Sequence, residues 1–412
     1  MLSKKRSIVR WFLVASAILG VIWLATPKEM HRRLGDLRIY LPLDEIAGKI
    51  PWIDPAVRAS GTARVVAQGD DIQVTDDDLP QLEPAIAVNP LDPDNIVVGF
   101  MGITDVPEQR CGYAVTKDGG ATWRVRQSFP DLPHSGGADP VIVADADGIF
   151  YASCLNFTGT SDTPQAVPET LTVSRSDDGG ETWLSPTHVV SRDLVDFLDK
   201  EWLAVDRTDG PYAGRVYMAY VYFPFLFANI PHNQVQIVHS DDGLSFSSPV
   251  RVSDTLDPDI LHQGVAPGVD HEGTIHLVWM QFGVLSQLLY DRSTDGGETW
   301  GRDVTITNIR SVPQYGIAGF YRVPTMPAFG VDATEGPYQG HLYAVWNGYD
   351  HGDADIFMVR STDGGTTWEE PRRINDDVVG NGKDQLFPAI VVDRAGIVRI
   401  MWLDRRDDPE NL

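Results

Sequence analysis

The sequence predicts an all-β protein, a six-bladed β-propeller preceded by an N-terminal hydrophobic helix. Three observations predict this class. A turn sequence recurs five times at intervals of about one blade, pairs of short apolar strands recur six times, and a basic and then apolar segment comes first. Repeats of this length are typical of folds in which each unit buries its apolar face against the next unit.

The recurring turn is eight residues long. It reads TKDGGATW (116–123), SDDGGETW (176–183), STDGGETW (293–300) and STDGGTTW (361–368), with a shorter relative, SDDGLSF, at 240–246. Aspartate can accept backbone N–H bonds within a turn, glycine supplies positive φ, and tryptophan is a large apolar anchor between sheets. We therefore expect these turns to be structural. Their aspartates are spaced 60, 64, 53 and 68 residues apart, which suits four-stranded blades: Asp118, Asp178, Asp242, Asp295 and Asp363.

The apolar strand pairs predict the inner half of each blade. Their first strands are EPAIAV (83–88), DPVIVA (139–144), EWLAVD (201–206), GVAPGVD (264–270), PAFGVD (327–332) and FPAIVVD (387–393). The sixth pair has no turn sequence after it. We expect a propeller over residues 61–412 with an incomplete sixth blade, and we expect the segment 62–74 to help close the ring, because an open ring leaves unpaired strand edges.

The first residues predict export. Four basic residues precede an apolar run from Trp11 to Ala25, which is the charge order of an export signal. No A-x-A cleavage sequence follows. Residues 1–25 are therefore expected to be a signal anchor or a cleaved signal peptide, and residues 26–60 a tether, with the propeller outside the membrane.

Charge and cysteine content exclude several classes. Residues 1–40 carry +6 (eight Lys/Arg against two Asp/Glu), so with −25 overall residues 41–412 carry −31. Such a body repels phosphate backbones and anionic lipid, so we expect no nucleic-acid partner, membrane contact only through the N-terminal segment, and a monomer. Cys111 and Cys154 are too few for a disulfide scaffold. One disulfide or two buried thiols remain open.

The turns resemble the Asp-box (BNR) repeats of the sialidase-like superfamily, over about residues 80–412. That resemblance implies a propeller and a glycosidase of the exo-α-sialidase type. YRVP (321–324) resembles the family's F/Y-R-I-P signature, so Arg322 would hold a substrate carboxylate. An aspartate of the following loop, Asp350 or Asp353, would be the general acid. The arginine that usually follows is replaced by WNGYD, and arginines appear instead at Arg405 and Arg406.

Propeller geometry places the site where the inner strands begin. The side chains expected there are Glu83, Asp139, Glu201, Arg322 and Asp384, with Asp105, Glu108, Arg110, Asp162, Tyr349, Asp350, His351, Asp353, Asp404, Arg405 and Arg406 from neighbouring loops. Aromatic residues of the loop 221–234 could form a stacking platform or a lid. Facing carboxylates can supply the acid and base of glycoside cleavage, and they can equally bind a cation or hold strand ends.

Two functions follow from these residues. The first is an extracytoplasmic glycan-acting hydrolase, sialidase-like, that takes a glycan or small carbohydrate and needs no cofactor. Its expected catalytic residues are Asp353, Asp350 and Glu201. Its expected substrate-binding residues are Arg322, Arg405, Arg406, Glu83, Asp139, Asp384 and Tyr349. The histidines show no zinc-binding spacing, so we expect no metal. The alternative is a non-catalytic binding or scaffold propeller, because this fold alone does not determine activity.

Overall fold

The computed structural model describes residues 72–75, 81–103, 109–133, 136–157, 170–191, 196–224, 233–255, 257, 259–315, 317–320 and 322–408. Within these residues the regular secondary structure consists of β-strands. Five sheets have four antiparallel strands each, and a further sheet has two. The prediction of an all-β propeller is confirmed, with five complete blades.

The strands of each sheet follow in chain order. The first blade contains β1 (Gln81–Val88), β2 (Ile96–Ile103), β3 (Gln109–Thr116) and β4 (Arg124–Arg126). The second contains β5 (Gly136–Ala144), β6 (Phe150–Phe157), β7 (Thr170–Ser176) and β8 (Thr187–Ser191). The third contains β9 (Asp196–Val205), β10 (Val216–Pro224), β11 (Gln234–Ser240) and β12 (Val250–Arg251).

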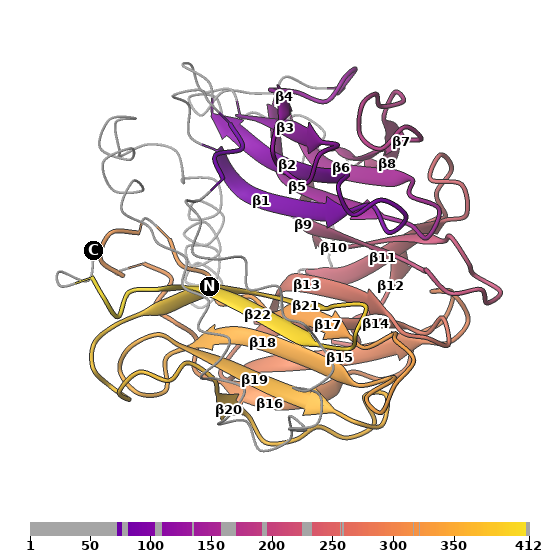
Figure 1. Ribbon diagram of the computed structural model, residues 1–412. Coiled ribbons are helices and arrows are strands. Elements are labelled where there is room, and N and C mark those ends of the chain that lie inside the picture. Colours follow the sequence, from indigo (N-terminus) through magenta and orange to yellow (C-terminus); the bar gives the residue numbers. More distant parts are fainter. Residues whose placement is uncertain are drawn as a thin grey trace, which may run out of the picture.

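The fourth blade contains β13 (Leu261–Val269), β14 (Ile275–Phe282), β15 (Ser286–Ser293) and β16 (Val304–Ile309). The fifth contains β17 (Ala328–Val331), β18 (Leu342–Gly348), β19 (Asp355–Ser361) and β20 (Arg372–Arg373). The two-stranded sheet contains β21 (Gln385–Val392) and β22 (Val398–Asp404). Figure 1 shows these sheets following one another around the molecule in chain order.

The first strand of each sheet lies on the inside of the ring. β1, β5, β9, β13, β17 and β21 each pack against the next in this series. The first and last strands of this series, β1 and β21, are joined by a contact between the turns that follow them. Arg394 lies in the turn after β21, and its guanidinium donates to the backbone carbonyl of Pro90 in the turn after β1. The beginnings of the inner strands therefore lie together at the opposite end of the ring.

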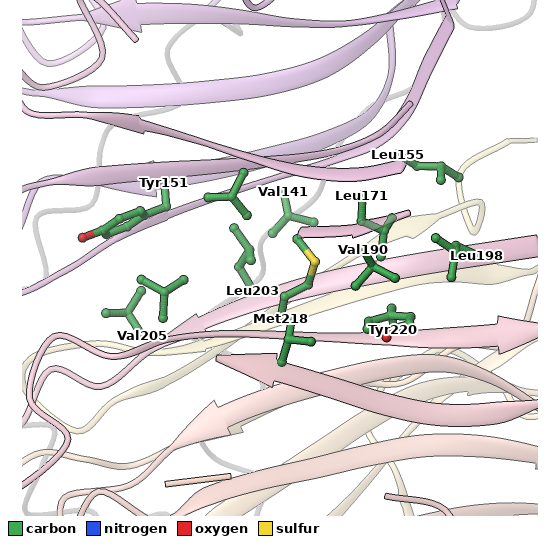
Figure 2. Close-up of a cluster of buried hydrophobic side chains, with 13 residues drawn as sticks. Val141, Tyr151, Leu155, Leu171, Val190, Leu198, Leu203, Val205, Met218 and Tyr220 are labelled. Atoms are coloured by element: carbon green, nitrogen blue, oxygen red, sulfur yellow. The ribbon is translucent and has the colours of Figure 1, made fainter. Parts of the chain in front are cut away.

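Apolar side chains fill the space between adjacent blades. Figure 2 shows the cluster between the second and third blades, where Leu171, Leu198 and Met218 are fully buried. Burial of one such side chain contributes about 1.5–3 kcal/mol to folding. This packing fixes how each inner strand stands against its neighbour, and so it positions the side chains at the inner-strand ends.

The recurring turns form closed hydrogen-bonded units. In the second blade, the Asp178 carboxylate accepts bonds from the Thr182 backbone N–H at 2.9 Å and hydroxyl at 2.6 Å, and from the Ser176 hydroxyl at 2.9 Å. The first, fourth and fifth blades repeat this set at Asp118, Asp295 and Asp363. These carboxylates are committed to the turn that contains them, as the sequence predicts for structural turns.

A cation also joins each of the first four blades to the turn of the next blade. We call these contacts interblade latches, and each donates to a backbone carbonyl: Lys117 to Asp178 at 3.0 Å, Arg175 to Asp242 at 2.6 Å, Arg215 to Gly296 at 2.9 Å and Arg292 to Gly364 at 2.6 Å. In the fifth blade, Arg360 pairs with Glu369 of its own blade.

A disulfide joins the first two blades. Cys111 on β3 and Cys154 on β6 are bonded, which decides between the two alternatives that the sequence left open. The bond spans 43 residues. Closing a loop of that length in the unfolded chain stabilises the fold by about 4 kcal/mol in the chain-entropy model.

Several predictions fall outside the described residues. These are the N-terminal helix, the tether, most of the closing segment 62–74, the loop acids Asp105, Glu108 and Asp162, and the middle of the aromatic loop at 225–232. Within the described ranges, no helical segment has the length and hydropathy of a membrane span.

Candidate active site

A bulge with left-handed backbone recurs at the beginning of the inner strands. In five sheets the first strand carries one extra residue opposite the second strand, at equivalent places in the ladder. The first extra residue has a φ of 49–65° in each case: Glu83, Asp139, Lys200, Gly264 and Phe387. Only glycine adopts this conformation without strain, so four of the five positions hold a strained side chain.

The bulge residues of the first three blades form an ion-paired cluster. The Lys200 ammonium lies 3.0 Å from a Glu83 carboxylate oxygen and also contacts the Asp139 carboxylate. The Asp139 backbone N–H donates to the other Glu83 oxygen at 2.9 Å. About a third of the Glu83 side chain is exposed (31%), whereas Asp139 is buried. We call these three residues the acid–lysine cluster.

The two carboxyl groups of this cluster differ in proton affinity. Burial alone would raise the pKa of Glu83, but the Lys200 charge and hydrogen bonds from Asp139 outweigh burial and lower it to about 2. Burial and the charge of Glu83 raise the pKa of Asp139 well above its usual value, and Lys200 offsets only part of that rise. The pair therefore holds one proton more readily than two separate carboxyls would, and Glu83 is the ionised member.

Further acids lie beside the acid–lysine cluster. Asp199 is buried and accepts a bond from the Gln263 amide at 2.5 Å. Burial raises the pKa of Asp199, and the charges of Lys200 and Arg322 offset part of the rise. Glu201 is fully buried, its carboxyl has no hydrogen-bond partner among the described residues, and burial raises its pKa well above the usual value.

Arg322 lies at the edge of this group. Its side chain is half-buried, and its charge offsets part of the rise in the pKa of Asp199. The structure thus brings together Glu83, Asp139, Glu201 and Arg322, four of the residues expected at the inner-strand ends. It adds Lys200 and Asp199, which the sequence reasoning missed.

The equivalent positions in the later blades are not charged. Gly264 stands in the fourth blade, and a Cβ there would come within 2.9 Å of the Met326 side chain. The two-stranded sheet places Phe387 at its bulge, with 38% of the residue exposed. The bulge positions are therefore charged in the first three blades and uncharged in the fourth blade and in the two-stranded sheet.

Asp384 does not join the central group. Its carboxylate accepts the Ala354 backbone N–H at 3.0 Å and lies 3.5 Å from the Arg405 guanidinium. It stands three residues before the bulge residue Phe387, whereas Glu83 and Asp139 are themselves bulge residues, and this register difference accounts for its different surroundings. Arg405 is buried, donates to the Ala318 carbonyl at 2.9 Å and lies 5.6 Å from the Phe320 ring.

The fifth-blade loop acids form a second group. Asp353 is 3% exposed, one carboxylate oxygen accepts the Gly382 backbone N–H at 2.7 Å, and the other has no partner among the described residues. Burial is the main cause that raises the pKa of Asp353, and its acidic neighbours are Asp355, Asp377 and Asp384. Asp353 and Glu201 share no interacting charged neighbour, so the three expected catalytic acids do not form one cluster.

Three more of the expected residues lie in or beside this second group. Asp350 is exposed, and Tyr349 packs in an apolar cluster with Phe320 and Val323. Arg406 pairs with Asp376 at 2.5 Å and with Asp404 at 2.7 Å, so its charge is neutralised within its own neighbourhood.

Two further observations concern ligands. No group of three or more His, Cys, Asp or Glu side chains among the described residues is arranged to hold a metal ion. A cavity of about 410 Å³ lies elsewhere, between residues 72–75 and the first-blade turn around Trp123, and no charged side chain lines it. The acid–lysine cluster is the better candidate for chemistry, because it combines exposed and buried carboxyls with opposite pKa shifts.

No protein-family model and no curated protein matches the sequence. Solved structures with a similar fold do exist. A GH93 α-L-arabinofuranosidase of Fusarium graminearum, solved with arabinobiose, is 13% identical with a TM-score of 0.52, over 79% of this chain and 94% of that chain. A leech intramolecular trans-sialidase is 12% identical with a TM-score of 0.52, over 82% of this chain and 67% of that chain.

A protein of unknown function from Dyadobacter fermentans is 17% identical with a TM-score of 0.50, over 79% of this chain and 94% of that chain. At these identities the similarity shows the fold alone. The fold is a β-propeller of the kind found in sialidase-like and GH93 enzymes, and such enzymes act on glycans.

Proposed function

We propose that this protein is a glycoside hydrolase whose active site is the acid–lysine cluster. The observation that carries the proposal is the pair of carboxyls joined by Lys200 where the inner strands begin, with the pKa of Glu83 lowered and that of Asp139 raised. Glycoside cleavage needs one carboxylic acid to protonate the leaving oxygen and one carboxylate to act as nucleophile or base.

Glu83 is the carboxylate in this proposal. It is the more exposed acid, and its low pKa keeps it charged at working pH. Asp139 donates the proton, and Lys200 fixes the orientation of both groups. Asp353, with its raised pKa, and the exposed Asp350 are the alternative acids that the family resemblance favours, and Glu201 is a further buried acid close enough for the charge of Asp139 to raise its pKa.

Sialoside specificity is the finer part of the proposal, and it rests on Arg322. This half-buried guanidinium at the edge of the cluster would hold the carboxylate of the sugar. The paired arginines Arg405 and Arg406 are bound to protein carboxylates, so they do not extend that grip in this arrangement. We further propose that β21 and β22 belong to a sixth blade, and that the propeller is exported, membrane-anchored through residues 1–25, and monomeric.

A non-catalytic scaffold is the second candidate, and one specific observation favours it. Lys200 ties the first three blades together through two ion pairs, which is also what a structural clamp would do. In that case the cluster would matter for stability and not for turnover.

Hydrolysis of fluorogenic glycosides tests the proposal. We expect turnover of at least one compound in a panel with sialic acid, arabinofuranose and hexose donors, and we expect Arg322→Ala to abolish sialoside turnover. Sialoside turnover that survives in Arg322→Ala would remove this residue from substrate binding. A folded protein that turns over none of the panel would favour the scaffold.

A further inference from the structure

Phe387 has a backbone conformation that an aromatic residue rarely adopts. Its φ is 54°, in the left-handed region, and it directly precedes Pro388, which further disfavours helical backbone at that position. Glycine meets the same requirement without strain at the equivalent bulge, as Gly264 does. A strained non-glycine residue points to a function for the side chain that the strain delivers.

The side chain of Phe387 is partly open to solvent. It is 38% exposed, and its ring lies 5.6 Å from that of Phe320 in a tilted arrangement. Phe320 in turn lies beside the buried Arg405 guanidinium. The supporting ring is therefore held in place by a buried cation, while the outer ring keeps free surface.

The position of Phe387 relates it to the acid–lysine cluster. It is the fifth member of the set of bulge residues whose other members include Glu83, Asp139 and Lys200. Since the inner strands pack in series around the ring and its two ends meet through Arg394, the bulge of the two-stranded sheet follows the first-blade bulge around the axis. The set of bulge residues therefore contains both charged side chains and an aromatic ring.

We infer that Phe387 is a substrate-binding residue that stacks on the apolar face of a sugar ring held by the acid–lysine cluster. The inference rests on the proposed function and extends it. A pyranose or furanose has a C–H face and a rim of hydroxyl groups, so it matches a site with an aromatic surface opposite hydrogen-bonding carboxylates. The strain at Phe387 is retained because it aims the ring at that face.

Three variants test the inference: Phe387→Ala, Phe387→Gly and Phe387→Trp. We expect Ala and Gly to raise KM for the best fluorogenic glycoside roughly tenfold, the effect of a lost contact of ordinary strength, with kcat within about twofold. We expect Phe387→Trp to keep KM close to the value of the unaltered protein. Gly should melt at a higher temperature than Ala, because glycine adopts a φ of 54° without strain.

Val391→Ala is the matched control. Val391 is an apolar residue on the same strand with 55% of its surface exposed, outside the bulge, and its replacement should leave KM unchanged. An unchanged KM in Phe387→Ala, or a Gly variant that melts below the Ala variant, would overturn the inference.

Saturation-transfer NMR with methyl glycosides of a pentose, a hexose and N-acetylneuraminic acid separates this inference from the proposed hydrolysis. Sugar binding without turnover, lost in Phe387→Ala and kept in Val391→Ala, would support the platform and reject hydrolysis. Turnover with equal KM in all variants would support hydrolysis and reject the platform. No binding of any sugar would overturn the inference.

Discussion

The two ends of each blade repeat in different ways. At the turn between the third and fourth strands, the same side chains make the same bonds, as at Asp178 and Asp295. At the inner-strand bulge, the backbone recurs while the side chains change from Glu83 to Lys200 to Phe387. A repeated side chain on a repeated backbone serves the fold itself. Where the backbone repeats but the side chain varies, as at the strained bulges, the side chains have a role other than holding the fold together.

The two ends also differ in electrostatics. Hydrogen bonds from Thr122 and Thr116 lower the pKa of the turn residue Asp118 to about 2. Burial and neighbouring carboxylates raise the pKa of Asp139 and Glu201 at the bulge end. The turns hold carboxylates in their ionised form, whereas two of the carboxyls at the bulge end, Asp139 and Glu201, resist ionisation, as a proton donor must.

The largest expected effect is on kcat/KM, and it distinguishes the inner-strand bulge from the turn. Glu83→Gln keeps the shape of the side chain and removes its charge, so kcat/KM should fall by about 10²–10⁴, and the melting temperature should fall as well because Lys200 loses an ion-pair partner. Steady-state kinetics and thermal melts measure both. Asp295→Asn, at a turn, is the control and should leave kcat/KM unchanged. Full activity in Glu83→Gln would contradict the assignment of the active site to the bulge end of the blades.

A comparison of two lysines sharpens the contrast in stability. Lys200→Met leaves two buried or half-buried carboxylates without their cation, so the free energy of unfolding should fall by about 3–5 kcal/mol. Lys117→Met removes an exposed interblade latch and should cost about 1 kcal/mol or less. Urea unfolding of both variants gives the two values. Equal losses would show that Lys200 is no more important than a surface cation.

Removing one turn carboxylate tests the structural end directly. Asp295→Ala loses bonds from Thr299 and Ser293, and we expect the free energy of unfolding to fall by about 2 kcal/mol with kcat/KM unchanged. Urea unfolding measures the loss, and Glu298→Ala, one residue before Thr299 in the same turn, is the control. A loss of activity in Asp295→Ala at a temperature where it stays folded would contradict a purely structural role.

The smallest expected effect is the pH dependence of stability. The folded-state pKa of Asp118 is lowered, so its contribution is present above pH 4 and is lost as pH falls toward 2. The folded-state pKa of Asp139 is raised, so its contribution is present below pH 4 and is lost as pH rises. Unfolding from pH 3 to 8 should show both trends. Asp139→Asn should remove the second only, and an unaltered profile in that variant would contradict its raised pKa.

The fold class could be predicted from the sequence. The turns DGG-x-T-W and the apolar strand pairs predicted an all-β propeller, because the residues of each motif determine its local backbone conformation. The disulfide could only be left open, since Cys111 and Cys154 are 43 residues apart and pair through the packing of two blades.

The site was harder to predict because it depends on register. Glu83 and Asp139 were expected near the axis, but Lys200 was passed over although it immediately precedes Glu201. The missing signal was the bulge. Aligning the inner strands on E-P-A-I, D-P-V-I, K-E-W-L and F-P-A-I places Lys200 and Phe387 in register with the two acids. A strand alternates its side chains, so an error of one residue exchanges an exposed group for a buried one.

The interblade latches give the ring a direction. Each of the four runs from one blade to the turn of the blade that follows it in the chain. In each latch the donor is on the earlier blade and the acceptor is on the later one. A force that peels the propeller from its first blade withdraws one donor at a time, whereas a force on the last blade withdraws one acceptor at a time. The ring is therefore expected to come apart in blade-sized steps, and its mechanical resistance to be set by the single weakest overlap.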